Sequence, residues 1–100
     1  MLVYNITVKI EPSIDPEWRE WIKIPVARVM GSGCFIDHRI CRLLRQDESD
    51  GNTYVIQFSL QSEAEYDRYE KEWEPVFREE FSTAFSGQYV AFRTLMEVMD

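Results

Sequence analysis

Positive charge is scarce in this chain of 100 residues. Eleven lysines and arginines stand against eighteen aspartates and glutamates, which gives a formal net charge of −7. Nucleic acids and anionic membranes attract proteins through clusters of lysine and arginine. The nearest such group, Arg39, Arg42 and Arg45, is spaced by three, and residues at that spacing do not share one face of a strand. The composition therefore argues against a nucleic-acid partner and against a membrane partner.

Long apolar runs and cysteines are also few. No segment approaches the roughly 18 apolar residues of a membrane span, and the first residues lack the basic start and apolar core of a signal peptide. Within one strand, Cys34 and Cys41 would lie roughly 23 Å apart, too far for a disulfide. We therefore expect reduced thiols and a cytoplasmic location. No linker or repeat interrupts the chain, so we expect a single domain over residues 1–100.

Alternation of apolar and polar side chains predicts the strands. Residues 2–11 alternate regularly, and residues 53–61 do the same. Residues 34–46 and 89–98 predict two further strands, with weaker alternation in the first of them. The polar segment 47–52 contains an Asp-Gly pair, which indicates the turn of a hairpin.

Two helical segments lie between these strands. The run Asp15-Pro16-Glu17 is typical of a helix start, with Asp15 as the capping residue. Pro25 predicts a break near Lys23 and Ile24, and the Gly-Ser-Gly run at 31–33 predicts the end of this helix.

The second helical segment covers residues 62–86. Ser62 and Glu65 have the spacing of a capping box, and aromatic residues then recur at intervals of three and four. Pro75 predicts a bend, and Gly87 predicts the end of the helix.

The order strand, helix, hairpin, helix, strand predicts a ferredoxin-like βαββαβ fold of the α+β class. Right-handed crossovers would place both helices on one face of a four-stranded antiparallel sheet. We expect the covered face to carry Tyr4, Ile6, Val8, Tyr54, Ile56, Phe58, Val90 and Phe92. The opposite face would then carry Val3, Asn5, Thr7, Val55, Gln57, Ser59, Tyr89, Ala91, Arg93, Leu95 and Met99.

This opposite face is too apolar for a comfortable solvated surface and too polar for a dry core. An antiparallel sheet with one wet side is the plain interpretation. A mixed patch of this size also marks interfaces, and we favour a homodimer formed through the sheet face.

Four segments resemble a known family: the opening Val-Tyr-Asn-Ile-Thr-Val, the helix from Glu17 to Ile22, the Gly-Cys-Phe run at 33–35, and residues 90–94. The family is an uncharacterised bacterial one, known mainly as a domain of unknown function in Bacteroidetes. The similarity covers essentially the whole chain. It implies a relation by fold to the dimeric α+β barrels, which include cofactor-independent monooxygenases and haem-degrading enzymes.

The resemblance implies the fold and a dimer, but no established activity. Family members carry His-Ile-Pro near the end of the first helix, whereas this chain has Lys23-Ile24-Pro25, so any role of that histidine is absent. Haem degradation in the superfamily generally uses a histidine on the second helix, and residues 62–86 contain none.

His38, the only histidine, is a weak candidate for a general base. By alternation it shares a face with Ile36 and Ile40, near the helix–sheet cleft, but a histidine on an edge strand is commonly just solvated. A metal site with Cys34 and Cys41 is excluded because His38 and Cys34 would lie roughly 13 Å apart along a strand. We therefore predict no metal and no cofactor.

A polar group on the sheet is the second candidate. Asn5, Gln57 and Arg93, with Tyr89 and Thr7 nearby, are expected to line a pocket inside a dimeric barrel and bind a carboxylate or carbonyl, with Arg93 as the anion partner. The alternative is that these side chains bind one another across the dimer interface, and this is the more common outcome.

Two functions follow from these patterns. The first is a homodimeric module that serves a structural role or binds a small apolar or aromatic molecule, either in the cavity between the two sheets or in the helix–sheet cleft. The second is a cofactor-independent monooxygenase or isomerase for a small aromatic or polyketide-like substrate. In it, Arg93, Asn5 and Tyr4 or Tyr54 would polarise a substrate oxygen and His38 would move a proton.

Overall fold

Four strands form one antiparallel sheet in the computed structural model, which describes residues 1–100. Their order across the sheet is β2-β3-β1-β4, so β2 and β4 are the edges. Every neighbouring pair is antiparallel. The bounds are β1 Leu2–Ile10, β2 Asp37–Arg42, β3 Asn52–Leu60 and β4 Tyr89–Glu97.

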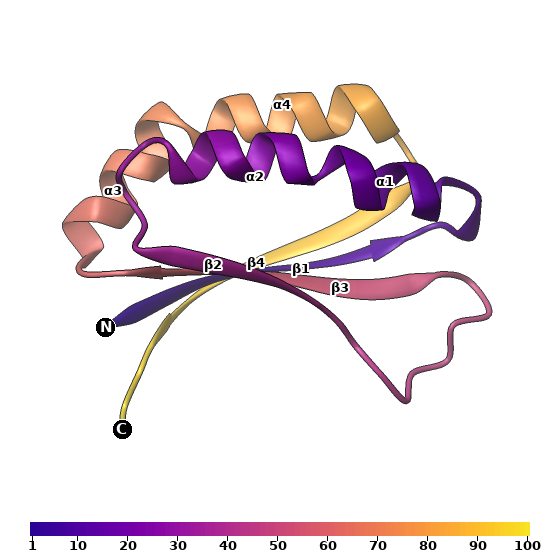
Figure 1. Cartoon of the computed structure of the whole chain (residues 1–100), viewed down its shortest axis with the longest axis horizontal. Coiled ribbons are helices and arrows are strands. Elements are labelled where there is room, and N and C mark those ends of the chain that lie inside the picture. The colour runs from indigo at the N-terminus through magenta and orange to yellow at the C-terminus, as the bar shows by residue number, and fades with distance from the viewer.

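The helices lie together on one face of this sheet (Figure 1). A short 3-10 turn, η1, covers Pro12–Ile14, and the α-helices are α1 Asp15–Trp21, α2 Lys23–Met30, α3 Glu63–Glu72 and α4 Glu74–Phe85. The predicted βαββαβ fold with one covered face is confirmed.

Each predicted helix is divided in two. The first divides at Ile22, one residue before the predicted break at Lys23 and Ile24. The second divides at Trp73, so Pro75 falls in the first turn of α4, where its missing N–H would have had no partner in any case.

The predicted capping interactions are wrong. Ser62 precedes α3 but makes no side-chain hydrogen bond to its first turn. Asp15 is already helical, Ile14 is the capping residue, and the Asp15 carboxylate binds Asn52 and Tyr54 on β3 instead.

The second strand is shorter than the predicted range 34–46. Cys34 and Phe35 precede β2 and are buried, and the Phe35 ring lies 4.7 Å from the Phe58 ring, centroid to centroid. These two residues therefore lie in the core, and β2 begins only after them. Both cysteines are free thiols, Cys34 buried and Cys41 exposed.

The fourth strand presents the opposite face from the one predicted. Ile6 pairs with Arg93, and the neighbouring pairs of β1 and β4 place Tyr89, Ala91 and Leu95 on the same covered face. Directly paired residues of antiparallel strands share a face. Val90, Phe92, Thr94 and Met96 therefore lie on the open face, with Asn5 and Thr7.

The buried core lies between the helices and the covered face. Alternate residues of β1 and β3 supply its floor, and aromatic side chains of the helices cover them. The largest buried side chains are those of Trp18, Tyr4, Tyr69, Phe58, Phe77, Phe81 and Phe85. Rings fill the space between the helices and the sheet, and a cleft lies at the β2 edge, between α1 and this short strand.

Candidate functional site

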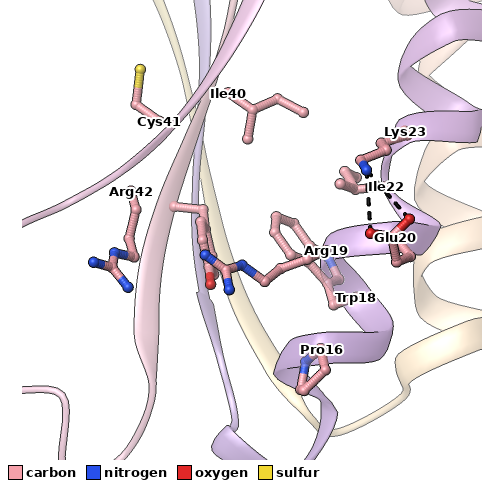
Figure 2. A pocket seen from close by; sticks show the side chains of 10 residues that line it. Pro16, Trp18, Arg19, Glu20, Ile22, Lys23, Ile40, Cys41 and Arg42 are labelled. Atoms are coloured by element: carbon pink, nitrogen blue, oxygen red, sulfur yellow. Dashed lines mark hydrogen bonds and ion pairs between the residues drawn. The ribbon is translucent and has the colours of Figure 1, made fainter.

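A cleft of about 650 Å³ opens between α1 and the β2–β3 edge of the sheet. Its size is in the range of small-molecule sites in proteins. Figure 2 shows Arg19 of α1 extending toward the strands, with Ile40 directed to the helical side and Cys41 to the other side of its strand. The lining residues are Pro16, Trp18, Arg19, Glu20, Ile22, Lys23, Ile40, Cys41, Arg42 and Tyr54.

Two aromatic rings form the inner wall of the cleft. Trp18 of α1 is fully buried, and its ring centroid lies 4.8 Å from that of Tyr54 on β3. The indole Nε1 of Trp18 is buried and has no hydrogen-bond partner. Buried polar groups are normally paired, so this N–H is a donor that the protein itself leaves unused.

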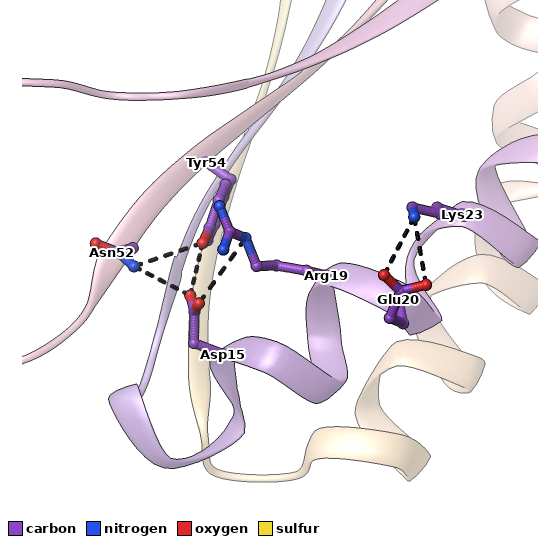
Figure 3. A network of polar contacts seen from close by, with 6 residues as sticks. All are labelled: Asp15, Arg19, Glu20, Lys23, Asn52 and Tyr54. Atoms are coloured by element: carbon purple, nitrogen blue, oxygen red, sulfur yellow. Dashed lines mark hydrogen bonds and ion pairs between the residues drawn. The ribbon is translucent and has the colours of Figure 1, made fainter.

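A polar network ties the cleft to the start of α1 (Figure 3). The Tyr54 hydroxyl donates a hydrogen bond of 2.6 Å to Asp15 Oδ1, and Asn52 Nδ2 donates one of 3.2 Å to the same oxygen. Burial, followed by the hydrogen bond and charge of Asp15, raises the pKa of Tyr54 above its ordinary value. The Tyr54 phenol therefore keeps its proton to a higher pH than an ordinary tyrosine.

The outer wall of the cleft is cationic. Arg19 lies with its guanidinium carbon 5.8 Å from the centre of the Tyr54 ring, and its Nε is 3.9 Å from Asp15 Oδ2. Lys23 is paired with Glu20 at 3.2 Å. Arg42 lies opposite Tyr54 in the β2–β3 register and makes no ion pair.

The predicted polar group on the sheet is divided between two faces. Gln57 Nε2 donates a 3.1 Å hydrogen bond to Asn5 Oδ1, and both lie on the open face as expected. Arg39 joins them through a 3.0 Å bond from its Nε to Gln57 Oε1. Arg93 and Tyr89 lie on the covered face, so the expected pocket is not assembled.

Arg93 instead belongs to a buried ion pair with Glu74. Glu74, the first residue of α4, is only 4% exposed, and Arg93 Nε lies 2.6 Å from its Oε1. The Tyr4 hydroxyl donates hydrogen bonds of 3.0 and 2.9 Å to the two carboxylate oxygens, and Arg78 Nε donates one of 3.2 Å. Two cations and a phenol thus compensate the cost of burying this carboxylate.

Burial also dominates the protonation of the tyrosines around Glu74. It raises the pKa of Tyr4 and of Tyr69 far above the ordinary range, and the Glu74 charge adds to both shifts. The Tyr69 hydroxyl is buried without a hydrogen-bond partner. None of these enclosed groups lines the cleft.

His38 pairs with Phe58 in the sheet register and so lies on the covered face, as alternation predicted. It is exposed, and its ring centroid is 6.2 Å from that of Phe58. Because β3 and β1 separate β2 from β4, His38 and Arg93 lie on strands roughly 14 Å apart. The acid–base group proposed from the sequence is therefore not assembled.

No cluster of three or more histidine, cysteine, aspartate or glutamate side chains is placed to bind a metal ion. None of the helices has the length and apolar character needed to cross a bilayer.

Sequence reasoning named a helix–sheet cleft as one of two possible ligand sites but did not bring together the residues that line it, although two signals for them were present. Asp15 and Arg19 are spaced by four residues on one helix face. Arg42 and Tyr54 are related across the hairpin of β2 and β3. The missing element was the register of β2, which the weak alternation of residues 34–46 does not fix.

Residues 1–99 match the model of a family described as "Domain of unknown function (DUF4286)". No curated protein matches the chain. The whole-chain resemblance to a family of this kind is confirmed.

Solved structures share the fold at low sequence identity. A variant of SnoaB, a cofactor-independent oxygenase from Streptomyces nogalater, is 16% identical with a TM-score of 0.73, covering 99% of this chain and 94% of that one. An EthD family protein from Bacillus halodurans is 15% identical with a TM-score of 0.66, covering 99% and 100%. A dimeric ferredoxin-like protein from an uncultured marine organism is 13% identical with a TM-score of 0.63, covering 100% and 96%.

Proposed function

This chain belongs to the DUF4286 family, and we propose that it is a homodimeric protein that binds a small aromatic molecule in the cleft between α1 and the β2–β3 edge. One observation carries the ligand-binding part of this proposal. The cleft combines a wall of Trp18 and Tyr54 with a buried indole N–H that has no partner in the protein. An apolar cleft with a few placed polar groups is the usual form of a small-molecule site.

The open face of the sheet supports the dimer. On β4, Val90 is 56% and Phe92 65% exposed, and Met96 of the same open face is exposed as well. Asn5, Gln57 and Arg39 supply a hydrogen-bonded polar strip beside them. A second copy of the same face would cover these apolar side chains, and similar structures include dimeric ferredoxin-like proteins.

The cleft is tested by blocking it. In the wild type, small aromatic fragments should shift the NMR signals of the Trp18 indole N–H and of Ile40. Ile40→Trp should fill the cleft and abolish these shifts. Val76→Trp, in a separate groove formed with Trp21 and Thr83, is the matched control and should leave them unchanged. Shifts that persist in Ile40→Trp would show that the ligands bind elsewhere.

A second candidate function is an acid–base enzyme such as a cofactor-independent oxygenase or isomerase. It is favoured by one observation, the 2.6 Å hydrogen bond that orients the Tyr54 phenol at the cleft wall toward Asp15. SnoaB, with a similar fold, is described as a cofactor-independent oxygenase. Turnover of hydroxylated aromatic substrates with oxygen uptake, lost in Tyr54→Phe, would support this function. Rates equal to background in both proteins would exclude it.

A further inference from the structure

The cations around the cleft indicate the chemical class of its ligand. Three of the eleven cationic side chains line this one cleft, those of Arg19, Lys23 and Arg42, against the single carboxylate of Glu20. The chain as a whole carries a net charge of −7. The residues that line the cleft therefore carry a net positive charge, opposite in sign to that of the whole protein, which favours an anion there.

The two arginines differ from Lys23 in how their charge is used. Lys23 Nζ is bound to both oxygens of Glu20, at 3.2 and 3.3 Å. Arg42 makes no ion pair, and Arg19 has only the 3.9 Å contact with Asp15. Both guanidinium groups keep free donors, and planar guanidinium donors match the geometry of a carboxylate.

The positions of the arginines relative to the aromatic wall fit one ligand shape. Arg19 extends from α1 toward the strand that bears Arg42 (Figure 2), and it lies over the Tyr54 ring. Arg42 is opposite Tyr54 in the sheet register. An aromatic ring against Trp18 and Tyr54 would thus carry its anionic substituent to the mouth of the cleft, between the two arginines.

We propose that the α1–β2–β3 cleft binds an aromatic carboxylate, with the ring against Trp18 and Tyr54 and the carboxylate held by Arg19 and Arg42. This inference rests on the proposed function and names its ligand class. Binding breaks the 3.9 Å contact of Arg19 with Asp15 and moves Arg19 away from the Tyr54 ring, whereas Asp15 keeps its hydrogen bonds from Tyr54 and Asn52.

Two matched compounds test the charge requirement. Binding of 2-naphthoate and of its neutral counterpart 2-naphthalenemethanol is measured by titration of the Trp18 indole N–H signal. We expect 2-naphthoate to bind about tenfold more tightly, which corresponds to about 1.4 kcal/mol. Its advantage should shrink as salt is added, because exposed charges are screened.

Arginine variants separate charge from structure. Arg42→Gln and Arg19→Gln should each weaken 2-naphthoate by about three- to tenfold and leave 2-naphthalenemethanol unchanged. Arg39→Gln removes the same charge from the same strand but on the open face, and it should change neither affinity.

The outcomes distinguish this inference from the function on which it rests. Equal affinity for the two compounds, with both lost in Ile40→Trp, would overturn the carboxylate assignment and leave the cleft as an aromatic site. A fall in both affinities in Arg42→Gln and Arg19→Gln would also overturn it. Failure of both compounds to bind would contradict the inference and the proposed function together.

Discussion

Glu74 is the one charged residue that is buried in this fold. Its carboxylate accepts hydrogen bonds from Tyr4 and Arg78 and lies 2.6 Å from Arg93 Nε. These partners come from β1, α4 and β4, so one side chain connects α4 to two neighbouring strands of the sheet. A carboxylate placed this way fixes the start of α4 relative to the sheet.

Removing this charge should destabilise the protein strongly. In Glu74→Gln the cations of Arg93 and Arg78 lose their counter-charge, and breaking a buried pair in this way costs about 3 kcal/mol. The midpoint of urea unfolding should fall accordingly. Glu79→Gln, an exposed position on the same helix, should change the free energy of unfolding by less than about 0.5 kcal/mol. Equal, small effects would show that the Glu74 pair contributes little.

Stability should also decrease at alkaline pH. Burial raises the pKa of Tyr4, Tyr54 and Tyr69 in the folded protein, and it raises the pKa of Tyr66 to about 12. An unfolded chain releases these protons near pH 10, whereas the folded chain keeps them. The folded state then binds more protons, so the free energy of unfolding falls as pH rises through 10.

Urea unfolding at pH 8, 9.5 and 10.5, followed by tyrosinate absorbance, measures this dependence. Tyr69→Phe should reduce this pH dependence, because the variant lacks one of the phenols whose pKa burial raises. The substitution breaks no hydrogen bond, since the Tyr69 hydroxyl has no partner. An unfolding midpoint that stays constant from pH 8 to 10.5 would contradict the raised pKa values of these tyrosines in the folded protein.

At the scale of elements, alternation identified the strands but not the orientation of β4. Its two sets of alternate residues are both largely apolar: one contains Tyr89 and Leu95, the other Val90 and Phe92. Arg93 made the first set resemble a solvated face. Its burial depends on Glu74, a partner 19 positions away on another element, and no local pattern reports such a pair. The same limit hid the set of residues that line the cleft, which depends on the register of the weakly alternating β2.

The breaks in the helices were more predictable, because their cause is local. Pro25 and Pro75 each lack the N–H that a helix interior needs, and the chain divides within three residues before each proline.

The loop before β3 offers a sharp test at this scale. Gly51 has a φ of 130°, and a Cβ atom there would lie 2.0 Å from the carbonyl oxygen of Ile10. Gly51→Ala should cost about 3 kcal/mol and lower Tm by roughly 10 °C or more. Gly87→Ala is the control: its φ is 74°, but nothing lies within 4 Å, and it should cost only about 1 kcal/mol. Equal losses would mean that backbone conformation alone, and not the contact with Ile10, sets the cost.

For the whole molecule, the corrected orientation of β4 strengthens the dimer proposal. It places Phe92 and Val90 on the open face and Leu95 against the core. Phe92→Glu should therefore convert a dimer to a monomer at micromolar concentration, because the new charge would be buried in the interface. Analytical ultracentrifugation measures this change. Val76→Glu, on the helical side, should remain dimeric. A dimer that survives Phe92→Glu would place the interface elsewhere.

Native mass spectrometry of the gently purified protein with added 2-naphthoate tests the central claim most directly, because it reports assembly and ligand together. We expect a species of twice the chain mass that carries one ligand per chain. Ile40→Trp should abolish the added mass, and Val76→Trp should retain it. A monomer, or a dimer that takes up the same mass in Ile40→Trp as in the wild type, would contradict the proposal of a homodimer with an aromatic-binding cleft.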